Sequence, residues 1–328
     1  MFSFRGEQAL QFGLLHLITL AGSTGMLTCL VLAVACVARW PVYVSAQTVD
    51  ETALLIIDVQ DCFLPNGSLA VTDGDQVIPV INRIRQDFEQ DFSLVVLSQD
   101  WHCPDHVSFA SQHEGGTPYS LVNLTYNSEG RLCREDSIVS SDQHGVRCSP
   151  QKSDSDMITV TQTLWPDHCI KNVTSGPTSA AFSDSLKRKD SDVVIRKGFN
   201  CDIDSYSAFY DNGGFRQTEL NSVLKQHNVG RVVVTGLALD YCVYYTSLDA
   251  HKLGYKVITV TDAARGVAPD STSAALSDME ANGIELVKSE SLRAALDTSS
   301  NKATSSWDRH CAVILLSAMV LIHTTNLP

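Results

Sequence analysis

Apolar residues in the central part of the chain occur in two patterns, short runs and helically spaced sets. Residues 53–59 (ALLIIDV) form a nearly continuous apolar run, which is typical of a strand buried on both faces of a sheet. Residues 77–88 instead carry apolar side chains at positions 77, 80, 81, 84 and 88, which predicts a helix. Further strands are predicted at 93–98, 192–196, 231–235, 256–260 and 284–287, and further helices at 241–253 and 271–281. The alternation predicts one α/β domain over residues 47–296, a parallel β-sheet flanked by helices on both faces.

Residues 117–156 interrupt this alternation. They are rich in Ser, Asp, Asn and Gln, and they contain Cys133 and Cys148. We interpret the segment as a surface insertion that a disulfide between these cysteines holds in place. Closing so short a loop would stabilise the fold by roughly 3 kcal/mol.

The N-terminal residues 1–46 have the pattern of a signal peptide. The apolar stretch 26–37 is short for a membrane span, and the small residues at 44–46 suit a cleavage site. Because the lead-in before this stretch is long and poor in polar residues, an uncleaved membrane anchor is the alternative.

The C-terminal residues have the pattern of a lipid-anchor signal. Residues 297–310 form a small, polar linker, with the attachment region expected at 299–301, and residues 311–328 contain a terminal apolar tail. A buried C-terminal helix is the alternative, but no polar face interrupts the tail. The two ends together predict an extracellular protein that is held at the cell surface by glycosylphosphatidylinositol.

Charge and cysteine count agree with an extracellular, non-nucleic-acid-binding protein. The formal net charge is −13 and no Lys/Arg-rich block is present, which argues against nucleic acid as a partner. Asn66, Asn123 and Asn172 begin glycosylation sequons. Seven of the ten cysteines lie between the two removable ends, so in an oxidising compartment at least one thiol stays unpaired.

Four predicted strands end in a reactive side chain. Asp58 ends the first, the second continues into Asp100 and His102, the third delivers Lys197, and the fourth continues into Cys242. The carboxyl ends of parallel strands form the ligand crevice of an open α/β sheet. The sequence therefore predicts one pocket that contains all of these groups.

Within this pocket, Cys242 is the candidate nucleophile. It stands where a strand turns into a helix, so the helix N-terminus and a nearby Lys197 would lower the pKa of its thiol. Asp58 could accept the thiol proton and return it to a leaving group. The alternative for Cys242 is a small buried apolar side chain.

Asp100, His102 and His168 are candidate metal ligands. Asp100 and His102, two residues apart in an extended segment, share a face, and Pro166 favours an extended approach for His168. One carboxylate and two imidazoles suit Zn²⁺ or another divalent metal. His106 and His113 are competing ligands nearby in the sequence.

Five segments in order resemble the nicotinamidases of the isochorismatase-like hydrolase superfamily, over about residues 53–288. They are 58–63 (DVQDCF), 100–110 (DWHCPDHVSFA), 164–169 (LWPDHC), 196–198 (RKG) with 204–209 (DSYSAF), and 236–243 (GLALDYCV). The resemblance implies the isochorismatase-like hydrolase fold and deamidation of nicotinamide to nicotinate and ammonia through a thioester.

The resemblance also implies roles for the matching residues. Asp58, Lys197 and Cys242 would be the catalytic triad, and the metal on Asp100, His102 and His168, aided by Ser108 through water, would bind the pyridine nitrogen. The backbone amides of Ala238 and Cys242 would form the oxyanion hole, with a cis peptide expected between Leu237 and Ala238. Phe63 and Trp101 would form the walls around the ring, and Tyr206 and Tyr241 would be supporting packing.

Cys62 and Cys103 depart from the family pattern, and both flank the expected pocket. We expect them to be disulfide-bonded, either to each other or to Cys169 or Cys201. A homo-oligomer is compatible with the sequence, which does not itself indicate one.

Two other functions fit the sequence less well. A cysteine amidohydrolase acting on an N-carbamoyl or ureido compound would share the triad, but the metal site is characteristic of the nicotinamidase branch. A catalytically silent surface binding protein is argued against by the complete triad.

Overall fold

The structure is a computed structural model that describes residues 51–133 and 157–297. The predicted signal peptide, the anchor segment and residues 134–156 of the insertion lie outside the described residues. In the described part, no helix has the length and apolar character needed to cross a membrane.

The core of the fold is a six-stranded sheet in which every neighbouring pair is parallel. The strand order is β5-β2-β1-β6-β7-β8. The strands are β1 (Glu51–Ile57), β2 (Leu94–Asp100), β5 (Val193–Lys197), β6 (Val229–Leu237), β7 (Lys256–Arg265) and β8 (Glu285–Val287). The predicted parallel α/β sheet is confirmed, with boundaries shifted by a few residues.

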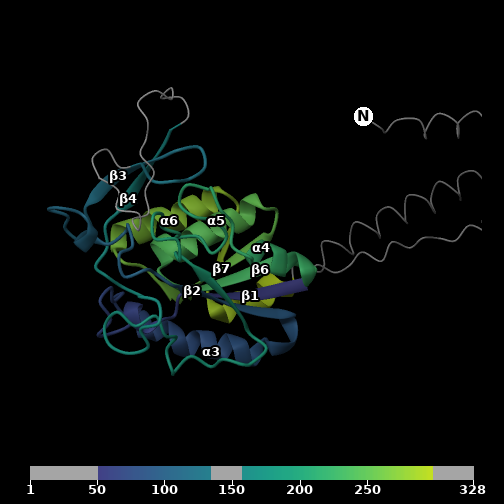
Figure 1. Cartoon of the computed structure of the whole chain (residues 1–328). Coiled ribbons are helices and arrows are strands. Elements are labelled where there is room, and N and C mark those ends of the chain that lie inside the picture. The colour runs from purple at the N-terminus through teal and green to yellow at the C-terminus, as the bar shows by residue number, and fades with distance from the viewer. Residues whose placement is uncertain (1–50, 134–156, 298–328) are drawn as a thin grey trace, which may run out of the picture. The chain divides into compact units, whose positions relative to one another are not determined.

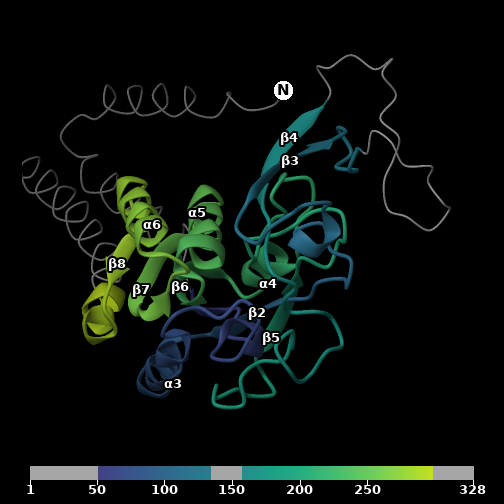
Figure 2. The same ribbon diagram turned by 90° about the vertical axis from the view of Figure 1, so that its left-hand side faces the viewer.

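Helices cover both faces of this sheet, as Figures 1 and 2 show. They are α3 (Val77–Asp87), α4 (Leu220–Gln226), α5 (Tyr244–Lys252) and α6 (Pro269–Ala281). Leu54 and Ile56 of β1 pack in the apolar cluster that includes α3, whereas the alternate residue Leu55 packs in the cluster that includes α4, α5 and α6. Because successive side chains of a strand point to opposite faces and both faces are covered, β1 is apolar and buried from Ala53 to Ile57.

Two helical details differ from the prediction. The helix expected at 241–253 begins as a π-helical turn, Leu239–Val243, and continues as α5 from Tyr244. The short α4 was not predicted, because its buried face consists only of Leu220 and Leu224, too few residues for a periodic signal.

The segment interpreted as a surface insertion is partly a β-hairpin. Strand β3 (Leu121–Tyr126) pairs antiparallel with β4 (Ile158–Thr163), so regular structure begins inside the expected insertion and continues beyond its end. Cys133, which follows β3, is disulfide-bonded. Its predicted partner, Cys148, lies outside the described residues.

The order of the strands in the sheet indicates where a ligand pocket is expected. Starting from β1, the chain adds β2 and β5 on one side and β6, β7 and β8 on the other. The order reverses at β1, and the carboxyl ends of strands at such a reversal form the ligand crevice of α/β folds.

Candidate active site

Four reactive side chains meet at the carboxyl end of the sheet. Asp58 directly follows β1, Asp100 and Lys197 are the last residues of β2 and β5, and Cys242 lies in the π-helical turn after β6. Neighbouring strands end at the same level, since Asp100 is paired with Lys197 in the sheet register. The strand ends therefore place these four groups in one cluster.

Lys197 is the centre of this cluster. Its Nζ lies 2.9 Å from Asp58 Oδ2 and 2.6 Å from Asp100 Oδ1, and it is 3.4 Å from the Sγ of Cys242. It also donates to the carbonyl of Ser205 at 2.9 Å. The side chain has no solvent exposure, and the carboxylates raise its pKa although burial opposes this. Lys197 is therefore a fixed positive charge between two acids and the thiol.

Asp58 has the properties of a general base. Burial raises the pKa of its carboxyl to about 6, against the opposing charge of Lys197. Ser98 donates to Asp58 Oδ1 at 2.6 Å and so orients the carboxyl group. Near neutral pH Asp58 is mostly a carboxylate that can take up a proton.

The structure does not show the expected low pKa of the Cys242 thiol. Burial raises the pKa of its thiol well above the ordinary value, and the effects of Asp58 and Asp100 add to this, whereas Lys197 lowers it. The resting enzyme therefore holds a thiol, which is in hydrogen-bonding contact with Asp58. Cys242 is the free cysteine of the described residues.

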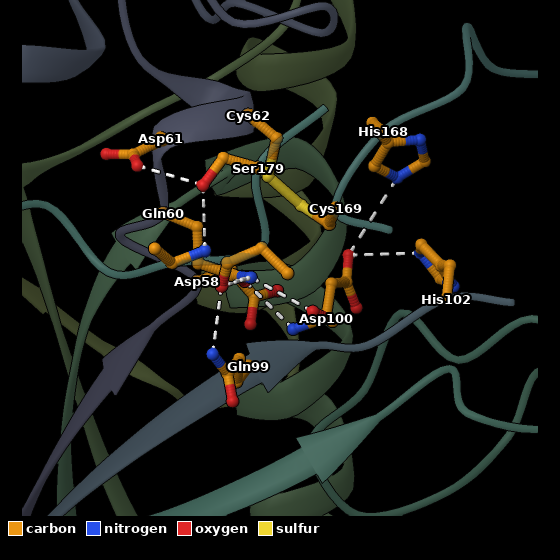
Figure 3. Close-up of a disulfide and its surroundings, with 12 residues drawn as sticks. Asp58, Gln60, Asp61, Cys62, Gln99, Asp100, His102, His168, Cys169 and Ser179 are labelled. Atoms are coloured by element: carbon orange, nitrogen blue, oxygen red, sulfur yellow. Dashed lines mark hydrogen bonds and ion pairs between the residues drawn. A yellow bond between two sulfur atoms is a disulfide. The ribbon is translucent and has the colours of Figure 1, made fainter. Parts of the chain in front are cut away.

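The predicted metal ligands come together on the other side of Asp100. His102 Nε2 and His168 Nε2 lie 3.5 and 3.9 Å from Asp100 Oδ2 (Figure 3). Each imidazole donates its Nδ1–H to a backbone carbonyl, His102 to Gly198 at 2.9 Å and His168 to Pro166 at 2.8 Å. Both lone pairs at Nε2 are thereby directed to the same space, as in protein metal sites.

The chemistry of this donor set fits a divalent cation. Ligand atoms of Asp100, His102 and His168 all lie within 4.8 Å of one another, and all three residues are buried. Burial lowers the pKa of His168 to about 3, so this imidazole is neutral and able to ligate. The buried Nε2 of His102 has no hydrogen-bond partner, which leaves a lone pair for a metal.

Gly198 permits this arrangement. Its φ is +63°, and a Cβ at this position would lie 2.4 Å from Cε1 of His102. The residue after Lys197 therefore has to lack a side chain, because His102 occupies that space.

The competing histidines have other partners. His106 Nδ1 is hydrogen-bonded to the hydroxyl of Ser108 at 2.7 Å, so Ser108 already has a side-chain partner. His113 contacts the carbonyl of Val107 at 2.7 Å. His106 also forms a second potential ligand group with His102 and Asp204.

A small pocket lies above these groups, with about 340 Å³ of empty space when its open mouth is included. Phe63 lines the pocket as predicted, but Trp101 does not. Instead, the guanidinium of Arg196 lies over the Trp101 ring, 3.9 Å from the ring centre. The lining residues are Phe63, Leu69, Asp100, Trp165, His168, Asp204, Tyr206, Ala238, Tyr241, Cys242 and Val267. Tyr206 and Tyr241, expected as supporting packing, are therefore pocket walls.

Gln162 of β4, which lies beside this pocket, was not predicted, because it belongs to no recognisable motif. Its Nε2 lies 3.0 Å from Asp204 Oδ2 and 3.1 Å from the hydroxyl of Tyr206. Gln162 is 1% exposed although its strand is largely solvated. A buried polar residue on an exposed strand could have been found only with the structure.

Ala238 and Cys242, the predicted oxyanion-hole residues, both line the pocket. The Leu237–Ala238 peptide is cis, as expected. The carbonyl of Ala238 accepts from the amides of Tyr241 and Val243, each at 3.1 Å, so it is turned into the helix start.

Two disulfides lie beside the site. Cys62 is bonded to Cys169 and Cys103 to Cys201, which selects two of the pairings that the sequence left open. The three sequon residues Asn66, Asn123 and Asn172 are exposed.

Comparisons with known proteins agree with this site. Residues 143–291 match the isochorismatase domain family. The nicotinamidase of Escherichia coli K12 is 38% identical over 236 residues, covering 71% of this chain and 93% of that protein. The yeast nicotinamidase solved with the inhibitor nicotinaldehyde is 30% identical, covering 72% of this chain and 99% of that one, with a TM-score of 0.60.

A further solved relative is a pyrazinamidase of Pyrococcus horikoshii in complex with zinc. It is 29% identical, covers 73% of this chain and 99% of its own, and has a TM-score of 0.52. The likeness in sequence and structure extends over the whole described domain. The chain belongs to the nicotinamidases of the isochorismatase-like superfamily, a group of amidohydrolases.

Proposed function

We propose that the protein hydrolyses nicotinamide to nicotinate and ammonia with Asp58, Lys197 and Cys242 as its catalytic triad. The observation that carries the proposal is the position of Lys197 Nζ, 2.9 Å from the Asp58 carboxylate and 3.4 Å from the Cys242 sulfur at the base of a small pocket. A base, a fixed cation and a thiol in mutual contact are the parts of an activated sulfur nucleophile.

The reaction follows from these contacts. Asp58 takes the thiol proton as the Cys242 sulfur attacks the amide carbon, while Lys197 stabilises the developing thiolate. The backbone amides of Ala238 and Cys242 donate to the oxygen of the tetrahedral intermediate. Asp58 then gives this proton to the amide nitrogen, so that the C–N bond breaks, ammonia leaves and a thioester remains on Cys242. Finally Asp58 removes a proton from water as the water oxygen attacks the thioester carbon. The C–S bond breaks, nicotinate is released, and the proton on Asp58 returns to the Cys242 sulfur.

Asp100, His102 and His168 would hold a divalent cation, for which Zn²⁺ is the proposed identity. Bound there, the cation supplies a Lewis acid for the pyridine nitrogen of the substrate. Support comes from the unpartnered Nε2 of His102 and from the zinc complex of the Pyrococcus relative. Phe63, Trp165 and Tyr241 would enclose the ring.

The test is direct. Purified domain is incubated with nicotinamide and ammonia release is measured, for the wild type, for Cys242→Ala and after treatment with a chelator. We expect the Cys242→Ala change to lower kcat by at least about a thousandfold. Deamidation that persists in this variant would refute the mechanism, and resistance to chelation would remove the metal from it.

We also propose that the enzyme works outside the cell, attached to the membrane by a lipid. The pattern of the two chain ends and the three exposed sequons support this location. Two disulfides between described cysteines support it further, since such bonds persist in oxidising compartments. Release of activity from intact cells by a phospholipase specific for glycosylphosphatidylinositol is the expected result, and activity found only after lysis would contradict it.

A further inference from the structure

Each of the two histidines proposed to bind metal is followed directly by a disulfide-bonded cysteine. Cys103 follows His102 and is bonded to Cys201, and Cys169 follows His168 and is bonded to Cys62. Figure 3 shows the Cys62–Cys169 bond lying between the Asp58–Cys62 segment and the His168 segment. The bridges therefore join four of the five segments that build the site.

The Cys62–Cys169 bridge links the segment that carries His168 to the segment that holds the Asp100 backbone in place. Two residues before Cys62, the side chain of Gln60 accepts from the Asp100 amide at 2.8 Å and donates to its carbonyl at 2.9 Å. On the other side of the bridge, the carbonyl of Cys169 accepts from the His102 amide at 3.0 Å. All three ligand residues are thus tied to this one bridge.

The backbone at Cys169 has an unusual conformation that the bridge helps to maintain. Its φ is +44°, in the left-handed region that residues with a Cβ rarely adopt. This turn directly follows His168, whose Nε2 lies 3.9 Å from Asp100 Oδ2. A covalent bond from Cys169 to the rigid Cys62 segment opposes relaxation of the turn.

The Cys103–Cys201 bridge has the equivalent position for His102. Gly198, whose carbonyl accepts from His102 Nδ1, is three residues before Cys201. The carbonyl of Cys201 accepts from the amide of Val107 at 2.8 Å. The bridge thereby fixes the 198–201 loop against the segment that carries His102.

We propose that the two disulfides are positioning elements of the metal site, and that the affinity for a divalent cation depends on both. The inference rests on the metal site of the proposed function. The cysteines touch no ligand position themselves and act through His102, His168 and Asp100. Loss of such supporting contacts weakens metal binding by roughly 10–100-fold in known sites.

The test compares three double variants of the full domain after removal of metal. They are Cys62→Ala/Cys169→Ala, Cys103→Ala/Cys201→Ala and, as the control, Cys133→Ala/Cys148→Ala, which removes a disulfide-bonded cysteine of the hairpin region and its predicted partner. Zn²⁺ affinity is measured by competition with a chromogenic chelator, and folding by circular dichroism. We expect about tenfold or greater weakening in the first two and less than twofold change in the control.

A variant that does not fold is replaced by a chemical experiment. In a Cys133→Ala/Cys148→Ala/Cys242→Ala background, a phosphine and one water reduce each remaining bridge to two thiols and give the phosphine oxide. Iodoacetamide caps the thiols, and Zn²⁺ affinity is measured on the folded product, with the same weakening expected.

The outcomes separate the inference from the function. Folded protein that lacks either bridge but binds Zn²⁺ as tightly as the wild type overturns the positioning role alone. A wild type that binds no Zn²⁺ overturns both this inference and the metal part of the proposed function, while leaving the triad to be judged by ammonia release.

Discussion

At the scale of single residues, the site depends on the charge balance around Lys197. One buried ammonium faces two buried carboxylates, Asp58 and Asp100, which serve different purposes. Burial raises the pKa of Asp58, whereas the charge of Lys197, with smaller contributions from the two imidazoles, lowers the pKa of Asp100. In the proposed mechanism, one of these two like residues acts as a base and the other as a metal ligand.

Removal of the ammonium should cost stability as well as activity. In Lys197→Met, two buried carboxylates lose their shared cation, so we expect the free energy of unfolding to fall by about 3–5 kcal/mol and ammonia release to be lost. Urea denaturation measures the first effect. The exposed Lys225→Met on α4 is the control, and a Lys197→Met protein of unchanged stability would contradict the prediction.

The raised pKa of Asp58 predicts the acidic side of the pH profile. The mechanism needs the carboxylate, so kcat/KM should fall as the pH drops below about 6. Ser98→Ala removes a hydrogen bond that favours the carboxylate, and the pKa should rise by on the order of half a unit to one unit. Steady-state rates from pH 4.5 to 8 would show the shift to higher pH, with Ser93→Ala as the control at the other end of β2. A shift to lower pH would show that another group controls the profile.

At the scale of elements, one wall of the pocket comes from the end of β4, which is not part of the six-stranded sheet. Gln162 and Trp165, at and just beyond the end of β4, contact the tyrosines of the pocket. Strand β4 is mostly exposed and rich in Thr, so its sequence resembles a polar loop more than a strand. The hairpin was therefore not predicted from apolar periodicity, whereas the six core strands were.

The hairpin should influence substrate binding more than chemistry. Gln162→Leu leaves Asp204 and the hydroxyl of Tyr206 without their amide donor, so we expect KM for nicotinamide to rise about tenfold with kcat changed less than threefold. Thr161→Val, on the same strand but exposed, is the control. A loss confined to kcat would place Gln162 in the chemical step instead.

The residues of the site differ in how far sequence could identify them. Asp58, Lys197 and Cys242 were found because parallel strand ends converge, a rule that needs only strand positions. Trp165 lines the pocket, whereas Trp101 was predicted to do so. This difference depends on the path of the chain after β2 and after β4, which the sequence does not reveal. The disulfide pairs stayed open for the same reason, since connectivity follows from three-dimensional proximity.

At the scale of the whole molecule, two long-range disulfides reinforce a nicotinamidase domain. The sheet and its order are those of a standard open α/β fold, and the bridges Cys62–Cys169 and Cys103–Cys201 span 107 and 98 residues of sequence. Disulfides that close such long loops stabilise a fold by roughly 4–5 kcal/mol in the chain-entropy treatment. The fold is therefore covalently reinforced around its catalytic end.

If the chain enters the secretory pathway, its sequons should carry glycans. Expressed in eukaryotic cells, the protein should run faster on denaturing gels after treatment with a peptide N-glycosidase. Asn66→Gln, Asn123→Gln and Asn172→Gln should each remove one step of that shift, because all three asparagines are exposed. A band that the glycosidase leaves unchanged would contradict the secretory assignment.

The close approach of Gly198 to His102 has a consequence for inherited variation. Every possible missense change at codon 198 adds at least a methyl group where an imidazole already lies. A saturation screen for loss of function should therefore recover position 198 as readily as the reactive positions themselves, although glycine offers no chemistry of its own.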